Sequence, residues 1–383
     1  MSLLQLSVSS SLQKFFFSNK KKGASIGALF FQEKTAFLLS RLSTAIWGFR
    51  GFSTTVLFVF LLFSFLLSSQ NSIAQEQKKP KIGLVLSGGG AKGFAHIGVL
   101  KVIEDAGIKI DYIGGTSMGA VIGGLYASGY NAAQIDSIFQ STNFDELIND
   151  FIPRSSKNFY EKRNDELYAL VLPFNKFNVG IPEALSKGMY NFNLLSRITR
   201  NVRHVRDFNQ LPIPFLCIGT NIETGEQVVL DKGNLAQAIL ASAAFPSLFS
   251  PVEIDGKLLV DGGVANNYPI EEVRKLGADI IIGVDVQDDL LDRKQLKNAT
   301  KILVQVTNLH SIQKMKAKVK DTDIYINPDI KNFGVISFDK GKEIVRRGEE
   351  AAFSVYEKMK ALAGEQDYYQ KPKLVLVPDS LEI

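Results

Sequence analysis

The chain has 383 residues, a formal net charge of +5 at pH 7 and a single cysteine. The basic residues are concentrated at the start, since residues 1–74 contain seven Lys or Arg and one acidic residue, Glu33. That segment carries +6, which leaves the rest of the chain at about −1. A nucleic-acid-binding protein carries its positive charge on a face of the folded domain. This distribution therefore argues against nucleic acid as a partner.

The first 74 residues predict an export signal. Two arginines precede the apolar run VLFVFLLFSFLL, residues 56–67, and small and polar residues follow it. Ser72-Ile73-Ala74 fits a signal-peptidase site, with the mature chain starting near Gln75. The run is shorter than the roughly 20 apolar residues of a membrane span. We therefore expect a cleaved signal peptide, with an uncleaved N-terminal anchor as the alternative.

Residues 81–129 predict two strand–helix units. KIGLVLSGGG (81–90) is a short apolar strand that ends in glycines, and the apolar spacing of 91–107 is helical. IDYIGGTS (110–117) is a second strand, and a small-residue helix follows at 118–129. Short connections between alternating strands and helices are typical of a parallel sheet that is covered on both faces.

The segment 131–210 is polar and helical, with scattered aromatic residues and no clear strand pattern, and we interpret it as a cap-like insertion over the sheet. The sheet resumes at PIPFLCIGTNI (212–222), and EQVVL (226–230) is its expected hairpin partner. The lone cysteine, Cys217, lies in this apolar strand. There it is expected to be inert core packing, and no intrachain disulfide can form.

The sheet is predicted to continue through residues 234–286. NLAQAILASAAF (234–245) is a helix, and PVEIDGKLLVDGG (251–263) is a hairpin around the turn pair Asp255-Gly256. A helix at PIEEVRKLG leads into the continuous apolar strand ADIIIGVDV (278–286), which is typical of a buried parallel strand.

Two amphipathic helices are predicted near the end of the chain, at 311–320 and 341–363, with TDIYINPDI (322–330) between them. The last residues, KLVLVPDSLEI (373–383), have a strand-like pattern with nothing after them to pair with.

The first motif with chemical meaning is SGGGAKG, residues 87–93. Three glycines at a strand end expose backbone N–H groups where a helix begins, which suits a phosphate or the oxyanion of a tetrahedral intermediate. The spacing Gly88-x-Gly90-x-x-Gly93 also matches a dinucleotide fingerprint, but the second strand ends without the acid that this function needs. We expect Lys92 to be a solvated lysine at the helix start; holding the loop or meeting a phosphate head group is the alternative.

The second motif is Gly115-Thr116-Ser117-Met118-Gly119, a Gly-x-Ser-x-Gly sequence between an apolar strand and a helix. This is the context of a nucleophile elbow, in which the flanking glycines avoid clashes at a sharp turn. Ser117 is therefore a candidate nucleophile. A serine hydroxyl attacks well only when a base removes its proton.

Two residues are candidates for that base. Asp261-Gly262-Gly263 follows a hairpin strand; alone it is typical of an ordinary turn, but two glycines let another group approach the carboxylate closely. His310 is the competitor, since the order Ser117, Asp261, His310 is that of an α/β-hydrolase triad. The sequence order leaves both open. Of the other histidines, His96 is expected to pack or to brace the glycine loop, and His204 to lie at the surface.

Together these stretches resemble the patatin-like phospholipases. The resemblance covers residues 81 to about 290 and rests on GLVLSGGGAKGFAHIGVL, IGGTSMGAVIGGLYASG, ILASAAFPSLFSPVEIDGKLLVDGGVANNYPI and GADIIIGVDV. The glycine loop, the elbow and the Asp-Gly-Gly triplet occur in the family's order. The resemblance implies a three-layer α/β/α sandwich with a mainly parallel central sheet.

It also implies a Ser–Asp dyad without histidine. Ser117 would be the nucleophile, Asp261 the general base, and the backbone of Gly88, Gly89 and Gly90 the oxyanion hole. The remaining motif residues would support this geometry: Lys92, Gly93, Gly115, Gly119, Gly262 and Gly263.

The implied reaction is hydrolysis of phospholipid acyl esters through an acyl-serine intermediate, as in a phospholipase A or lysophospholipase, without a metal or other cofactor. An acyltransferase or a non-lipid esterase on the same dyad is one alternative, and a non-catalytic lipid-binding module is another. The sequence does not separate water from an alcohol as the group that attacks the acyl-enzyme.

The expected organisation is a leader with signal peptide at 1–74, a catalytic domain at 75–365 and a linker or the start of a β domain at 366–383. The insertion at 131–210 would border the acyl pocket and meet a phospholipid or membrane surface. An exported chain of this kind resembles bacterial proteins whose patatin-like domain precedes an outer-membrane β-barrel. A continuous or associated barrel is therefore an expected partner, and the periplasm, outer membrane or exterior of a Gram-negative cell is the expected location.

Overall fold

The computed structural model describes residues 79–148, 186–297, 299–366 and 369–375, together with 158, 159, 174, 175, 178, 179 and 184. Internal contacts divide the chain into two units, Met1–Gln77 and Lys78–Ile383. The predicted leader and signal peptide lie outside the described residues. In the part of the chain that is described, no helix is long and apolar enough to cross a membrane.

The strands are β1 Ile82–Leu86, β2 Tyr112–Thr116, β3 Phe174–Asn175, β4 Asn178–Val179, β5 Phe215–Asn221, β6 Gln227–Leu230, β7 Val252–Ile254, β8 Lys257–Asp261, β9 Ile280–Val284 and β10 Ile324–Ile326. The α-helices are α4 Ala95–Asp105, α5 Met118–Ala127, α6 Ala132–Ser141, α7 Phe144–Ile148, α9 Met189–Ile198, α10 Leu235–Ser242, α11 Ile270–Lys275, α12 Ala299–Lys320, α13 Gly341–Phe353 and α14 Tyr356–Gln366. Short 3-10 helices are η1 Gly90–Phe94, η3 Arg200–Val202, η4 Phe208–Gln210, η5 Gly262–Val264 and η6 Phe338–Lys340.

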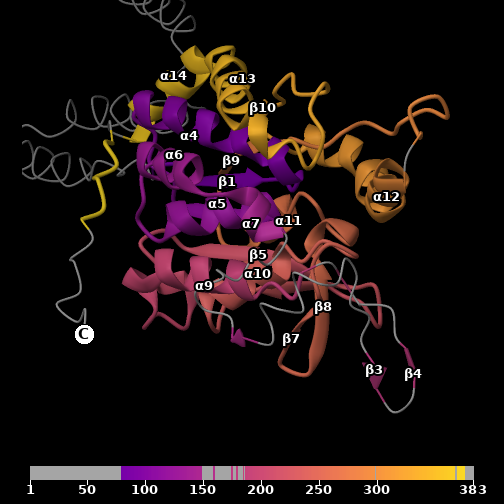
Figure 1. The fold of residues 1–383 in the computed structure, drawn as a ribbon. Coiled ribbons are helices and arrows are strands. Elements are labelled where there is room, and N and C mark those ends of the chain that lie inside the picture. Colours follow the sequence, from indigo (N-terminus) through magenta and orange to yellow (C-terminus); the bar gives the residue numbers. More distant parts are fainter. Residues whose placement is uncertain are drawn as a thin grey trace, which may run out of the picture. The chain divides into compact units, whose positions relative to one another are not determined.

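Eight of these strands form one mixed sheet in the order β10-β9-β1-β2-β5-β8-β7, with β6 paired to β5. Figure 1 shows β10, β9, β1, β5, β8 and β7 following one another across this sheet. The neighbours from β10 to β5 are parallel, whereas β8, β7 and β6 are joined by antiparallel pairing. The central strand β1, with the sequence IGLVL, is buried throughout, as expected for a strand covered on both faces.

Helices flank both faces of this sheet. Leu84 and Leu86 of β1 belong to the larger apolar core, which they share with residues of α4, α5, α10 and α13. Val85 points to the opposite face and joins the smaller core, with Val273 of α11 and Met315 of α12. Alternate residues of a strand point to opposite faces, so the two cores lie on the two sides of the sheet. The predicted α/β fold, with a mainly parallel sheet between helices, is confirmed.

The strand register brings the two motif strands together. Thr116 of β2 pairs with Ile218 of β5, and the next residue of β5, Gly219, pairs with Asp261 of β8. Ser117 and Asp261 therefore stand at the same level on either side of β5, about 10 Å apart at the backbone because each strand spacing is near 4.8 Å. Parallel strands β1 and β2 also end at one edge, which places the glycine loop beside Ser117.

Both predicted hairpins are present. β6 pairs antiparallel with β5, and β7 with β8. At the tip of the second hairpin, Asp255 and Gly256 have φ values of 51° and 73°. Two successive left-handed residues are what a type I′ turn needs, and Asp-Gly accepts this conformation readily. The local sequence thus sets the turn from β7 into β8, the strand that ends at Asp261.

The structure differs from the prediction in the segment 131–210. It contains a two-stranded antiparallel sheet, β3–β4, although no strand was predicted there. Each of these strands has two residues, which is too short to produce a recognisable alternation of polar and apolar residues. The segment begins with α6, which buries Ala132 and Ile135 and starts at a capping box formed by Asn131 and Gln134.

The late helices also differ in their limits. α12 begins at Ala299, well before the predicted start at 311, and the predicted helix at 341–363 is divided into α13 and α14. The predicted final strand does not form in its described part, 373–375. There the backbone of Leu374 exchanges hydrogen bonds with the side chain of Gln134, so a single amide takes the place of a partner strand.

Candidate active site

Ser117 stands at a sharp turn between β2 and α5. Its φ of 54° is in the left-handed region, which a residue with a side chain adopts rarely. The flanking glycines are required by close contacts, because a Cβ on Gly115 would lie 2.5 Å from Gly119 O and one on Gly119 would lie 2.3 Å from Leu86 O. The predicted elbow is therefore present, and it presents the serine hydroxyl away from the strand.

The hydroxyl of Ser117 donates a hydrogen bond to Asp261. The Ser117 Oγ to Asp261 Oδ2 distance is 2.5 Å, and the other carboxylate oxygen, Oδ1, accepts a hydrogen bond from Gly263 N at 2.7 Å. Asp261 is 4% exposed. Residues that are 144 positions apart in the chain thus form one buried, directly bonded pair, with the carboxylate oriented by the backbone of its own turn.

The glycines after Asp261 make this approach feasible. A Cβ on Gly262 would lie 2.1 Å from Ile218 O, and one on Gly263 would lie 3.0 Å from Asp261 Oδ1. Any other residue at Gly262 would push the turn away from β5. Glycine is therefore favoured at both positions, because a side chain would collide with the main chain of β5 or crowd the Asp261 carboxylate.

Burial changes the acidity of the Asp261 carboxyl. Desolvation raises its pKa from 3.8 to about 6, and this effect outweighs the hydrogen bonds from Ser117 and Gly263, which lower the pKa. Burial disfavours the charged form because water no longer solvates it. A carboxylate with a pKa near 6 is a stronger base than an exposed one, and it is still ionised at pH 7.

The glycine loop lies against the nucleophile. A Cβ on Gly88 would come within 2.8 Å of Ser117 Cβ. However, Gly88 N donates to Asn267 Oδ1 at 3.0 Å, and Asn267 Nδ2 donates to Gly88 O at 3.1 Å. The Gly88 N–H is therefore engaged, whereas within the described part of the chain Gly89 N and Gly90 N donate to no protein acceptor. Gly89 N and Gly90 N are therefore the loop donors that remain available, and their role in an oxyanion hole stays a prediction.

Gly90 shows why the loop needs glycine. Its φ is 58°, and a Cβ there would lie 2.2 Å from Val335 O. The following residue, Ala91, donates its N–H to the same Val335 O at 2.8 Å. The loop is thus held on one side by the segment around Val335 and on the other by Asn267.

Lys92 corrects the sequence-based expectation. It was predicted to be solvated, but it is 1% exposed and its Nζ forms an ion pair with Asp288. Asp288 follows β9, so this pair connects the glycine loop to the end of the neighbouring strand. This position agrees with the alternative expectation, that Lys92 holds the glycine loop. Beside it, Gly93 leaves room for the Met118 side chain.

In the described hydrogen-bond network, no histidine bonds to Ser117 or Asp261. His96 Nε2 is 2.8 Å from Ser87 O, and since a carbonyl only accepts, this nitrogen carries the proton and braces the glycine loop as predicted. Burial lowers the pKa of His96 to about 4, so its ring is neutral at pH 7. His204 is exposed, as predicted. His310 is exposed on α12, and both Asp261 oxygens are engaged by Ser117 and Gly263, so the geometry does not support the triad.

Several residues of the site were not predicted. Asn267 holds Gly88, and Ser242 Oγ accepts a hydrogen bond from Ser117 N at 3.1 Å. The sequence carries no local signal for Asn267, because its partner Gly88 is 179 positions away in the chain. No local pattern indicates Ser242, which reaches Ser117 only through the packing of α10. Among the described residues, no group of three or more His, Cys, Asp or Glu is placed to hold a metal ion.

Comparison with known proteins gives the family. A family model described as "Patatin-like phospholipase" matches residues 84–274. "Lysophospholipase NTE1" of Scheffersomyces stipitis is 29% identical over 320 aligned residues, which cover 75% of this chain and 19% of that protein. "Patatin-like phospholipase domain-containing protein ZK370.4" of Caenorhabditis elegans is 30% identical over 294 aligned residues, which cover 70% of this chain and 20% of that protein. The chain belongs to the patatin-like phospholipase family.

These relatives are much longer proteins, and the chain spans about a fifth of their length. Among solved structures, VipD from Legionella pneumophila has a TM-score of 0.41 and 17% identity, covering 73% of this chain and 67% of that one. The matching chain of the ExoU–SpcU complex of Pseudomonas aeruginosa has a TM-score of 0.40 and 18% identity, covering 74% of this chain and 52% of that one. Because both TM-scores are low, neither likeness supports a conclusion about this chain.

Proposed function

We propose that this protein is a lipid acyl hydrolase that cleaves phospholipid or lysophospholipid esters through an acyl-Ser117 intermediate. The observation that carries the proposal is the 2.5 Å hydrogen bond from Ser117 Oγ to the buried carboxylate of Asp261. Ser117 thus contacts a base of raised pKa at a sharp turn next to the glycine loop, where Gly89 N and Gly90 N have no protein acceptor in the described part of the chain. These are the features that acyl transfer to a serine requires. Family membership and the names of the relatives support lipids as the substrate class.

The geometry suggests the following steps. As Ser117 Oγ bonds to the ester carbonyl carbon, Asp261 takes the hydroxyl proton, and the oxyanion forms beside Gly89 N and Gly90 N. Collapse of the tetrahedral intermediate breaks the bond to the alcohol, which leaves with the proton from Asp261. Asp261 then takes a proton from water as the water oxygen bonds to the acyl carbon. When the second tetrahedral intermediate collapses, the bond to Ser117 Oγ breaks, the fatty acid leaves and Asp261 returns the proton to Ser117 Oγ. The carboxylate thus acts first as a base and then as an acid in each half of the reaction.

The substrate class is tested by incubating the full chain with defined phospholipids and lysophospholipids and identifying the products by mass spectrometry. We expect free fatty acid from at least one phospholipid or lysophospholipid. Acyl transfer to an added alcohol without release of fatty acid would identify an acyltransferase. Absence of any product, together with no reaction with a fluorophosphonate, would contradict the proposal and favour a non-catalytic lipid-binding module.

The raised pKa of Asp261 predicts the pH dependence of the reaction. Only the ionised carboxylate accepts a proton, so the rate of Ser117 acylation should be constant above its pKa of about 6 and fall about tenfold per pH unit below it. The measurement is the rate constant of fluorophosphonate labelling between about pH 4.5 and 8.5. A histidine base would titrate in a similar range, so the Asp261→Asn variant is measured in parallel. A step near pH 6 that persists in this variant would exclude Asp261 as its source.

We also propose that the protein is exported by a bacterial cell, which the apolar run at 56–67 and the Ser72-Ile73-Ala74 sequence support. The expected result is a mature protein that begins near Gln75. N-terminal sequencing of the protein purified from its native cells checks this. Recovery of the intact leader in the cytoplasm would contradict it.

A further inference from the structure

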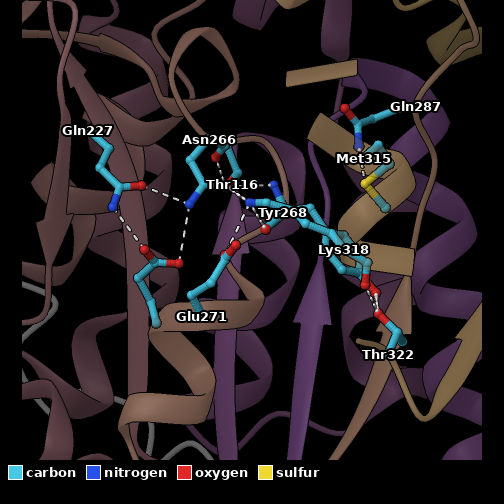
Figure 2. Close-up of polar contacts among 10 residues, drawn as sticks. Thr116, Gln227, Asn266, Tyr268, Glu271, Gln287, Met315, Lys318 and Thr322 are labelled. Atoms are coloured by element: carbon cyan, nitrogen blue, oxygen red, sulfur yellow. Dashed lines mark hydrogen bonds and ion pairs between the residues drawn. The ribbon is translucent and has the colours of Figure 1, made fainter. Parts of the chain in front are cut away.

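A buried lysine lies close to the Asp261 turn and is not used in the mechanism. Lys318 comes from α12 and is 9% exposed. Its Nζ donates to Asn266 Oδ1 at 2.6 Å and to Tyr268 O at 2.7 Å, and forms an ion pair with Glu271 Oε2 at 3.2 Å (Figure 2). Its pKa is lowered mainly by burial, against the opposing effect of Glu271. All three partners belong to the segment that follows Asp261.

Asn266 connects this lysine to the strand of the nucleophile. Its carbonyl oxygen accepts a hydrogen bond from Thr116 Oγ1 at 3.0 Å, and Thr116 is the residue directly before Ser117. Its Nδ2 donates to Gln227 Oε1 at 2.8 Å (Figure 2). The same nitrogen donates to Glu272 Oε2 at 3.2 Å. The side chain and carbonyl of Asn266 are therefore fully engaged, and it has one well-defined orientation.

The next residue, Asn267, contacts the glycine loop. Its side chain bonds to both N and O of Gly88, the first glycine of the loop. α12 makes a second contact with the Asp261 turn, since Ser311 Oγ donates to Gly263 O at 2.6 Å. The pair Asn266-Asn267 thus touches the nucleophile strand and the glycine loop, and it belongs to the turn that carries Asp261.

Stability alone is a weak reason for this arrangement. Removing an ammonium group from water costs several kcal/mol, and buried ion pairs often stabilise a fold no better than apolar side chains of the same size. A buried charge that has three directional partners does restrict where those partners can lie. The turn in question must place its carboxylate within hydrogen-bond distance of the serine, and a displacement of about 1 Å at such a site can cost on the order of 100-fold in rate.

We propose that Lys318 is a positioning residue, which fixes Asn266 and thereby holds Thr116, Gly88 and Asp261 in register for acylation. The proposal rests on the proposed function of the Ser117–Asp261 pair. It assigns α12 a role in the reaction although none of its residues contacts Ser117 in the described hydrogen-bond network.

The first test is Lys318→Met in the full chain, which removes the charge and the donors but keeps an unbranched side chain. We expect kcat and the rate of fluorophosphonate labelling to fall by about 10- to 100-fold, with KM changed by less than about threefold. Lys318→Arg should recover part of the loss because it keeps the charge and the donors. Lys316→Met, an exposed lysine on the same helix, is the matched control and should behave as wild type.

The second test removes the hydrogen bond between Thr116 and Asn266, on the side of Asn266 away from Lys318. It also covers the case in which Lys318→Met does not fold. Thr116→Val deletes the hydroxyl that bonds to Asn266 O and should lower kcat with little change in KM. If both residues act through Asn266, the double variant should lose less activity than the product of the two single losses. Folding of each variant is checked by thermal unfolding.

Two results would overturn the proposal. One is a folded Lys318→Met or Thr116→Val protein with wild-type kcat, and the other is single losses that multiply in the double variant. The proposed function is tested separately, by the activity of the wild-type protein. A wild-type chain that neither hydrolyses lipid nor reacts with the fluorophosphonate overturns both, whereas a reactive wild type with unaffected variants removes only the role of Lys318.

Discussion

Ser117→Ala is expected to lower the rate of lipid ester hydrolysis by about 10⁴-fold or more and to abolish fluorophosphonate labelling. The hydroxyl is the group that bonds to the acyl carbon, and no described neighbour can replace it. The nearby hydroxyl of Ser242 accepts a hydrogen bond from Ser117 N, so it serves the backbone and is not directed at the carboxylate. Product release from a phospholipid and the mass of the labelled protein measure the two losses.

The matched control for this variant is Ser354→Ala. Ser354 is exposed and caps the end of α13, and its side chain's one hydrogen bond among the described residues is to Ala351 O of that helix, so its loss should leave both activities unchanged. Alanine keeps a Cβ at this left-handed turn but removes the hydroxyl that bonds to Asp261, so the folding of Ser117→Ala is checked by thermal unfolding. Residual hydrolysis above one tenth of wild type in a folded Ser117→Ala protein would show that another residue forms the acyl-enzyme.

Asp261→Asn is expected to lower kcat by about 10²- to 10⁴-fold, the range attributed to a positioned general base. Asparagine has nearly the same shape, and its Oδ1 can still accept the hydrogen bond from Gly263 N. Its amide cannot accept a proton from Ser117. The variant therefore separates proton transfer from the architecture of the turn, which Asp261→Ala would not do.

The same variant should be more stable than wild type at alkaline pH. The pKa of Asp261 is about 6 in the folded protein against 3.8 for the unperturbed group, so folding favours its protonated form. Its contribution is fully favourable below about pH 4 and is lost as the pH rises through 6. Two pKa units correspond to about 3 kcal/mol. The neutral asparagine avoids this cost, so the variant should unfold at a higher temperature at about pH 8, with little difference at about pH 4.

This pair of opposite changes distinguishes the account from a simple structural one. A loss of activity that accompanies a loss of stability would mean that Asp261 holds the fold. A loss of activity with a gain of stability at pH 8 is the pattern of a functional residue kept at a cost to the folded state.

Much of the fold follows from short sequence patterns. The buried runs of β1 and β9 and the Asp255-Gly256 turn were recognisable because their apolar pattern and turn chemistry are local. The two-residue strands β3 and β4 were missed because they have no room for a period, and the start of α12 was missed because its first half is not clearly amphipathic. The export signal lies outside the described residues and stays a prediction.

The site could be predicted only in its parts that carry a local signature. Ser117 and Asp261 are marked by the glycines that their tight turns need, and the family resemblance paired them. The burial of Lys92 could not be predicted, because its partner Asp288 is 196 residues away. Asn267 and Lys318 were missed for the same reason, since their partners are set by tertiary packing. The engagement of Gly88 N by Asn267 also depends on such a contact.

The proposed dyad requires Asp261 to activate Ser117 without a histidine. The most direct test is the rate constant of fluorophosphonate acylation at about pH 8, measured side by side for wild type, Asp261→Asn and His310→Ala, with the labelled residue identified by peptide mass. We predict labelling at Ser117, a loss of about 10²-fold or more in Asp261→Asn, and a wild-type rate in His310→Ala. A wild-type rate in Asp261→Asn, or a comparable loss in His310→Ala, would contradict the dyad.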